Sequence, residues 1–457
     1  MEKITYEKPN KDFACIEFGD KRLTKRLEKS VSAMSQNTQE SILSACGSRH
    51  DAKAFYALLS NDKFSYSKIS ESAKEATAKR IKASGITEVL LPQDTTDINL
   101  SGHKKTKGLG YSNQHTKGIQ MHSCIAVTPD GIPLGLVAQQ YETRATAKSD
   151  TSKREKQKLP IEEKESYRWL ETTRKAIDVI PEGVTPVVIC DREGDFYELY
   201  NEMLSLGTSF VVRVSQNRST VNDVRSIQQL RQTPAYGEID ILIPRDSRQN
   251  NPARTVKMEV AYCQVTIIKP KHICTKAPDQ LSLNFVRITE IGETDSAIEW
   301  LLATNVTITD VDCAMKVIEY YEQRWKIERF HYVLKSGCGA EKIQQREYEK
   351  IQALLLIYSV IAAYILALTY ISRVYPDTPC NNFFEEDEWK ILHRIIKRDT
   401  KPPTEPYSLK TAIAYLGELG SYKHSPSDGD YGVKSLWKGL IKLFDAIDLL
   451  HRLMGQV

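Results

Sequence analysis

An amphipathic helix predicted between Asp310 and Ser336 governs how the rest of this 457-residue chain can be arranged. Apolar and aromatic side chains recur there every three or four residues, which is typical of a long helix with a buried stripe. Four polar side chains fall on that stripe, within about 60° of one another; they are Tyr321, Arg324, Glu328 and Lys335. A buried carboxylate needs a partner, because burying an unpaired charge is costly. Arg324, one turn before Glu328, can supply a simple ion pair, so geometry alone leaves structural and functional interpretations open.

Two aspartates follow short apolar segments that are predicted as strands. Asp94 ends the first of these segments, and Asp191 directly follows the last one. The expected order is strand, hairpin, helix and strand, over residues 88–94, 121–127, 132–138, 167–180 and 185–190. With a later helix that carries Glu328, this order predicts an α/β fold with a ribonuclease-H-like core. The first and fourth strands of that fold are neighbours, so the two aspartates are expected at one edge, with Glu328 above them.

The spacing Tyr-x2-Arg-x3-Glu-x6-Lys in the predicted helix resembles the Y-R-E-K signature of a branch of DDE transposases, which are enzymes of bacterial insertion sequences (the Tn-five and IS-four branch). The segments around the aspartates resemble the same family, since residues 94–96 match its D-T-T segment and residues 191–195 match its D-R-E-x-D segment. The resemblance spans nearly the whole chain. It implies that Asp94, Asp191 and Glu328 are the catalytic, metal-binding carboxylates.

Three other carboxylates compete with this assignment, namely Asp97, Glu193 and Asp195. Asp97 is expected to lie past the end of the first strand. Asp195 is expected to cap the helix that follows it, as aspartates at such positions commonly do. Each of the three therefore ranks below its neighbour, Asp94 or Asp191, as a candidate.

The long stretch before Glu328 is rich in segments with strand-like alternation, which predicts a β-subdomain inserted at about 208–305. The family also carries an insertion at this place. Trp300, within it, resembles the family tryptophan that stacks on a base flipped out of the DNA, although a tryptophan beside a strand is more often a core residue. Two further candidates for DNA contact are Arg192 and Arg213.

Helical domains are expected on both sides of the catalytic domain, over residues 1–75 and 373–457, with the catalytic domain at 76–372. Asp20 can cap an N-terminal helix whose basic face carries Lys21, Arg22, Lys25 and Arg26. Such a face is a solvated surface or, beside a nuclease-like core, a phosphate-contacting one. The resemblance implies that the N-terminal domain binds the transposon end and that the C-terminal domain mediates dimerisation.

The bulk composition permits this interpretation without demanding it. A net charge of +4 allows a polyanionic partner, and nine cysteines without a CxxC pair fit reduced thiols in a cytoplasm and disfavour a zinc module. The N-terminus lacks the apolar core of a signal peptide. Residues 353–368 approach the length of a membrane span but are shorter than usual, so a buried core helix and no membrane partner are expected. The expected location is the cytoplasm, at the nucleoid.

Three clustered carboxylates suit two Mg²⁺ ions, which prefer oxygen ligands and promote in-line displacement at phosphorus; Mn²⁺ is expected to substitute. The resemblance implies a cut-and-paste transposase that binds double-stranded inverted terminal repeats, cleaves the ends through a hairpin and joins the 3′-OH ends to target DNA. It would act as a homodimer on DNA, with Tyr321, Arg324 and Lys335 holding phosphates near the scissile bond. The alternatives are a ribonuclease-H-like nuclease or resolvase, and an inactive DNA-binding regulator derived from a transposase. Such a regulator would be expected to have lost one of the carboxylates.

Overall fold

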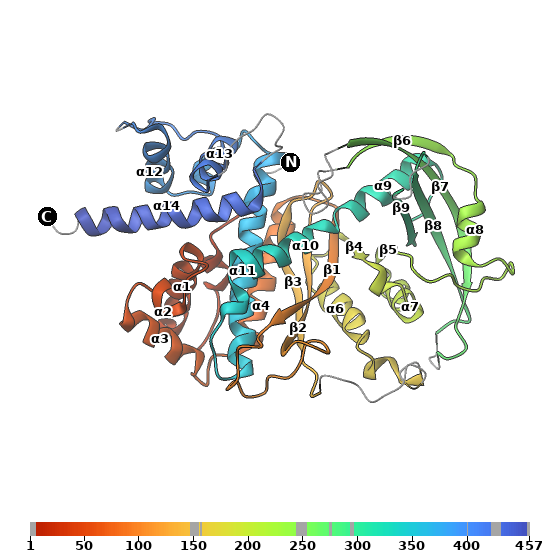
Figure 1. The fold of residues 1–457 in the computed structure, drawn as a ribbon, viewed down its shortest axis with the longest axis horizontal. Coiled ribbons are helices and arrows are strands. Elements are labelled where there is room, and N and C mark those ends of the chain that lie inside the picture. The colour runs from red at the N-terminus through yellow and green to blue at the C-terminus, as the bar shows by residue number, and fades with distance from the viewer. Residues whose placement is uncertain are drawn as a thin grey trace.

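The computed structural model of the chain describes residues 6–146, 155, 158–243, 254–273, 277–292, 297–399, 401–421 and 431–454. It has a mixed α/β architecture, in which a large sheet is covered by helices and further helices are contributed by the two ends of the chain (Figure 1). The core strands β1 to β4, between residues 88 and 190, and the long helix α11 (Tyr348–Val374) lie in the middle of the view, whereas β6, β7 and β8, between residues 237 and 290, lie at one edge (Figure 1).

The strands of the described residues form one nine-stranded sheet with the order β3-β2-β1-β4-β5-β9-β8-β7-β6. Their bounds are β1 Glu88–Asn99, β2 Gly118–Val127, β3 Pro133–Glu142, β4 Thr185–Cys190, β5 Ser209–Arg213, β6 Gly237–Ile243, β7 Arg254–Ile268, β8 Gln280–Glu290 and β9 Glu299–Thr304. β1, β4 and β5 are parallel to one another, whereas β2 and β3 pair antiparallel beside β1. This mixed sheet, with helices on its faces, is the ribonuclease-H-like core that the element order predicts.

The strands expected in the insertion continue the core sheet and do not form a sheet of their own. β5, the first of them, pairs parallel with β4 and so belongs to the core. β9 pairs antiparallel with β5, and β8, β7 and β6 extend the sheet outward from there (Figure 1). Alternating apolar residues predict each strand, whereas its neighbours depend on long-range pairing that alternation does not encode.

Helices cover both faces of the core sheet. Neighbouring side chains on a strand point to opposite faces. On β3, Gln139 donates to Ser359 Oγ of α11 (Tyr348–Val374) at 2.9 Å, whereas Gln140 contacts Thr172 of α6 (Tyr167–Ile177) at 2.8 Å. The helices α11 and α6 therefore lie on opposite faces. α4 (Tyr66–Ala83) packs beside α11, and α7 (Tyr197–Ser205) packs beside α6.

The apolar segment that resembles a membrane span lies inside the protein. Among the described residues, α11 is the one helix long and apolar enough to cross a membrane by length and composition. In its most apolar window, however, 94% of the residues are buried within the molecule. A helix that is apolar on all sides is typical of the core of a large domain, as the sequence predicts for residues 353–368.

Both ends of the chain are helical. The N-terminal helices are α1 Lys21–Gln36, α2 Ile42–Ala45 and α3 Arg49–Leu59, and the C-terminal ones are α12 Glu386–Lys397, α13 Leu409–Leu419 and α14 Val433–Met454. Asp20 caps α1 by accepting from the backbone N–H of Arg22 at 2.9 Å. α4 runs without a break through residue 75, and α11 runs through residue 372, so both expected domain boundaries fall inside helices. The three domain ranges stay predictions.

The helix predicted from Asp310 to Ser336 is divided, so the prediction of one continuous helix is wrong. The structure has α9 Val311–Glu322, α10 Trp325–Tyr332 and a π-helical turn at Val333–Gly337. Between α9 and α10 the backbone N–H groups of residues 323 and 324 bond the carbonyl groups three residues earlier, which tightens the helix locally. Apolar periodicity does not detect a single tightened turn, because the stripe continues across it.

Candidate active site

Asp94 and Asp191 lie side by side on the two central parallel strands. β1 and β4 pair in parallel up to Pro92 and Ile189, and each aspartate is two residues beyond its member of that pair. Asp94 Oδ1 accepts from the backbone N–H of Thr95, and Asp191 Oδ1 accepts from that of the residue two positions later, each at 2.8 Å. Both carboxylates are thus fixed by the backbone around them.

β1 is longer than predicted. It continues past Asp94 to Asn99 as the antiparallel partner of β2, so Asp94 lies within the strand and not at its end. The expectation that Asp97 falls past the strand is wrong for the same reason, since Asp97 pairs with Gln120 of β2. The sequence does not reveal this continuation, because the residues directly after Asp94 are polar and lack the apolar alternation that predicts a strand.

The electrostatic environment links the three candidate carboxylates. Burial, followed by the negative charges of Asp191 and Glu328, raises the pKa of Asp94 to about 7, against the lowering effect of the Thr95 N–H and of Arg324. Like charges that are gathered in one place disfavour each other's ionised forms. The glutamate of α10 therefore lies close enough to the sheet to act on Asp94.

Glu328 is held by an ion pair. Arg324 Nη2 donates to Glu328 Oε1 at 2.6 Å, with the guanidinium buried and the carboxylate side chain 35% exposed. The ion pair between Arg324 and Glu328, which the sequence permits, is therefore present in the structure. In the described part of the chain, no three Asp, Glu, His or Cys side chains converge closely enough to hold one metal ion.

The donor set nevertheless fits a hard divalent cation. Carboxylate oxygens are the ligands that Mg²⁺ takes from proteins. A cation between Asp94 and Asp191 would offset the negative charge of Asp191, which adds to burial in raising the pKa of Asp94. Glu328 could join it once its carboxylate turned away from Arg324.

Tyr321 and Trp300 pack together beside this site. Their rings are edge-to-face with centroids 5.4 Å apart, and Tyr321 is buried whereas Trp300 is partly buried. Burial raises the pKa of Tyr321, while the nearby guanidinium groups of Arg324 and Arg213 oppose the rise. Within the described residues, the Tyr321 hydroxyl makes no hydrogen bond of good geometry, although both guanidinium groups lie near it. A buried hydroxyl without such a bond is uncommon and calls for an explanation.

The remaining sequence candidates near the site are placed less centrally. Lys335 Nζ donates to the Asp97 carbonyl oxygen at 2.7 Å, and Arg213 Nη2 donates to the Glu299 carbonyl oxygen at 3.2 Å. Arg192 is exposed on the 3-10 turn that follows Asp191.

Asp195 has a different structural role from the one predicted. Phe196, and not Asp195, occupies the N-cap position of α7. The buried Asp195 carboxylate instead accepts from the backbone N–H groups of Ser215 and Gln216, at 2.6 Å each, and pairs with Arg218. The predicted cap is therefore wrong, because the loop after β5 supplies the donors that bind this carboxylate. These bonds leave Asp195 a structural residue.

The N-terminal basic face borders a groove. Arg22, Lys25 and Arg26 line a hollow of about 300 Å³ between α1 and α3, together with Lys29 and His50. Lys21 is exposed but does not line this groove. The side chain of Arg22 also pairs with Asp20, its helix cap, at 2.9 Å.

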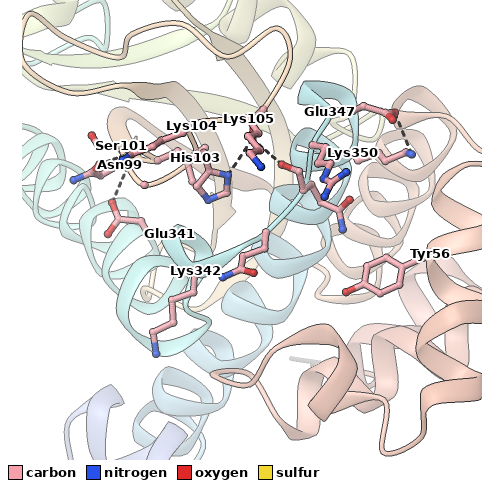
Figure 2. Close-up of a pocket in the computed structure, with 16 residues that line it drawn as sticks. Tyr56, Asn99, Ser101, His103, Lys104, Lys105, Glu341, Lys342, Glu347 and Lys350 are labelled. Atoms are coloured by element: carbon pink, nitrogen blue, oxygen red, sulfur yellow. Dashed lines mark hydrogen bonds and ion pairs between the residues drawn. The ribbon is translucent and has the colours of Figure 1, made fainter.

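A larger basic groove, of about 1110 Å³, lies where Tyr56 of α3 faces the catalytic region (Figure 2). Its cationic lining residues are Lys104, Lys105, Lys342, Arg346 and Lys350. The loop after β1 is tied to the segment after α10, since Thr106 Oγ1 donates to the Gln345 carbonyl oxygen at 2.7 Å. The basic, glycine-rich composition of residues 101–118 is a sequence signal for one wall of this groove. The other wall of the groove has no comparable pattern in the sequence.

A ribonuclease-H-like sheet with two adjacent aspartates and a glutamate on a later helix is the architecture of nucleases and transposases that cleave phosphodiesters. The sequence matches a family model described as transposase DNA-binding over residues 9–64 and a model described as transposase DDE domain over residues 87–366. The second match covers more than half of the chain, which belongs to the DDE transposase family. Among solved structures, the chain is similar to a piggyBac transposase synaptic complex with hairpin DNA, at 10% identity and a TM-score of 0.34, over 96% of this chain and 81% of that one.

Proposed function

We propose that this transposase works by cutting and pasting, and that it belongs to the Y-R-E-K (Tn-five and IS-four) branch of its family. It would bind inverted terminal repeats, cleave each end through a hairpin and join the freed 3′-OH to target DNA. The observation that carries the proposal is the equal register of Asp94 and Asp191 on β1 and β4, with Glu328 acting electrostatically on Asp94.

Asp94, Asp191 and Glu328 are proposed to hold two Mg²⁺ ions, or Mn²⁺ in their place. Bound there, the ions would activate the attacking oxygen and stabilise the leaving one. Arg324, which pairs with Glu328, would orient that carboxylate and contact phosphate when the pair opens. Tyr321 would offer its hydroxyl to the DNA, and Lys335 would lie beside the scissile phosphate.

The two basic grooves are proposed to contact duplex DNA. Lysine and arginine side chains that gather along a groove neutralise phosphates and release counterions. The larger groove joins α3 of the N-terminal helices to the catalytic region, so one duplex could touch both (Figure 2). Trp300, whose ring packs against Tyr321, would stack on a base, and Arg192 and Arg213 would contact phosphates nearby.

A homodimer on DNA, in the cytoplasm at the nucleoid, completes the proposal. The end of α14 exposes an apolar face that the rest of the described chain does not cover; its residues are Leu449, Leu450, Leu453 and Met454. Exposed apolar surface of this kind favours contact with another chain.

The test uses a labelled duplex that carries the inverted repeat found beside the gene. With Mg²⁺, the wild-type chain is expected to produce a hairpin and then a flush end, whereas Ca²⁺ should support binding without cleavage. Glu328→Gln should bind the duplex and leave it intact. Nicking without a hairpin or strand transfer would indicate a nuclease or resolvase, and binding without any cleavage would indicate a regulator.

A further inference from the structure

The residues that flank both candidate aspartates meet in a buried hydrogen-bond network under α6. Gln93 and Thr95 precede and follow Asp94, so their side chains point to the opposite face of the sheet. Gln93 Nε2 donates to Thr173 Oγ1 of α6 at 2.9 Å and to the sulfur of Cys190, the residue before Asp191, at 3.4 Å. The network thus reaches both aspartates from the side away from the site.

Arg168 of α6 bridges the two aspartate-bearing segments. Its Nε donates to Thr95 Oγ1 at 3.1 Å, and its Nη2 contacts Glu193 Oε2 at 3.3 Å, two residues after Asp191. Its Nη1 also donates to the Glu165 carbonyl oxygen at 2.8 Å. Arg168 is buried, and its fixed fork of donors makes it suited to holding several acceptors at set distances.

The hydrogen bonds of this network run in one direction. Because Thr95 Oγ1 accepts from Arg168, its hydroxyl hydrogen is directed at His122 Nδ1, 2.7 Å away. His122 Nε2 then carries the ring hydrogen and donates to Gln93 Oε1 at 3.1 Å. A neutral imidazole is required, and burial together with the charge of Arg168 lowers the pKa of His122 well below its usual value. Each donor in the chain is therefore matched to an acceptor.

We infer that Arg168, acting through Thr95 and the Asp191 turn, is a positioning residue that sets the separation of the Asp94 and Asp191 carboxylates for metal binding. The inference rests on the proposed metal-dependent function. Arg168 touches neither carboxylate, so it would act on metal affinity and not on the chemistry itself. Groups that orient metal ligands in this way commonly change affinity or activity by about 10- to 100-fold when they are removed.

Binding of Mn²⁺ to the full chain at pH 8, followed by the electron paramagnetic resonance of free Mn²⁺, tests this directly. Arg168→Gln is expected to weaken Mn²⁺ binding by about 10- to 100-fold. The Mn²⁺ concentration for half-maximal DNA cleavage should rise by a similar factor, with DNA affinity in Ca²⁺ unchanged and with most of the maximal rate recovered at saturating Mn²⁺. Arg174→Gln is the matched control, because Arg174 lies on the same helix but pairs with Glu202, which belongs to neither aspartate-bearing segment. It should bind Mn²⁺ as the wild type does.

A second pair of variants covers the possibility that Arg168→Gln unfolds. Thr95→Val removes the hydroxyl without changing charge or shape and is expected to weaken Mn²⁺ binding about tenfold, at the lower end of the range for orienting groups. Thr95→Ser restores the hydroxyl and should recover wild-type affinity. Wild-type-like binding in Arg168→Gln or Thr95→Val would overturn the inference and leave the proposed function standing. Absence of both Mn²⁺ binding and cleavage in the wild-type chain would overturn the proposed function, and the inference with it.

Discussion

Asp94 lies within β1 and Asp191 directly follows β4, the strand paired with β1. Glu328, in contrast, lies on a helix that starts at a tightened turn, and it is paired with Arg324. The positions of the aspartates follow from the backbone ladder and, on the far face, from the buried network of α6. The position of the glutamate follows from a side-chain rotamer and one ion pair. The sheet half of the site is thus fixed before any ligand binds, and the helix half is adjustable.

The strength of the ion pair decides whether this adjustment is accessible. The Arg324 guanidinium is buried, whereas the Glu328 side chain is 35% exposed, so solvent screens the carboxylate end of the pair. A divalent cation carries twice the charge of the guanidinium and takes carboxylate oxygens as its ligands. A bound cation can therefore draw Glu328 away from Arg324, while the aspartates need not move.

The largest expected effect comes from neutralising a carboxylate. Asp94→Asn, Asp191→Asn or Glu328→Gln should each reduce cleavage by about 10³-fold or more, because several kcal/mol of metal stabilisation are lost at roughly 1.4 kcal/mol per tenfold. Gel-shift affinity in Ca²⁺ should stay within a few-fold of wild type. Near-normal cleavage by any one of the three would remove that residue from the site.

The next largest effect is expected from Arg324→Ala, which distinguishes the helix half of the site from the sheet half. Glu328 is released, so the Mg²⁺ concentration for half-maximal cleavage should not rise, whereas loss of a phosphate-binding guanidinium should reduce the maximal rate by about 100-fold. Arg324→Lys keeps the charge but not the forked arrangement of donors, so its maximal rate should lie between those of the wild type and Arg324→Ala. A rise in the Mg²⁺ requirement with an unchanged rate would mean that Arg324 organises the metal ligands and does not contact DNA.

A smaller effect is expected from Tyr321→Phe. The hydroxyl is buried and makes no hydrogen bond of good geometry in the free protein, so its removal should not lower the melting temperature. If the hydroxyl bonds to DNA, cleavage should drop by about tenfold, which corresponds to one hydrogen bond to a charged group. Calorimetry and single-turnover cleavage on the same preparation check the two parts. A destabilised Tyr321→Phe protein would show that the hydroxyl has a structural partner.

The smallest effect is on stability in the absence of metal. Because the pKa of Asp94 is raised to about 7, its stabilising contribution is fully present below the unfolded pKa and is lost as the pH rises through about 7. With a chelator at pH 8, Asp94→Asn should therefore melt higher than wild type, by about 1–4 °C. At pH 4 the difference should vanish. A lower melting point for Asp94→Asn at pH 8 would contradict the crowding of negative charge at this site.

The sequence predicts the parts of this arrangement that depend on local pattern. The span of β4 and the cap at Asp20 match their predictions, and the order of strands leads to a ribonuclease-H-like fold. The continuation of β1 to Asn99 is not predicted, because its polar residues are covered by β2, which lies far away in sequence. The break at residues 323–324 is missed since a tightened turn preserves the apolar stripe.

The network of Arg168 and His122 has no sequence signature at all. An arginine on an amphipathic helix and a histidine on a strand are ordinary residues until the sheet brings them together. The same holds for Asp195, whose donors lie twenty residues further along the chain. Residues whose roles depend on partners far away in the sequence can be identified only from the fold, whereas residues that recur at fixed spacings can be identified from the sequence.

The most direct test is the anomalous diffraction of Mn²⁺ in a crystal of the protein bound to a pre-cleaved terminal-repeat duplex. We expect ions between Asp94 and Asp191, with Glu328 bound to one of them and no longer paired with Arg324. The aspartates should keep the positions that they have in the free protein. Ions bound elsewhere, or Glu328 still paired with Arg324 beside a fully ligated metal, would contradict the proposed metal site.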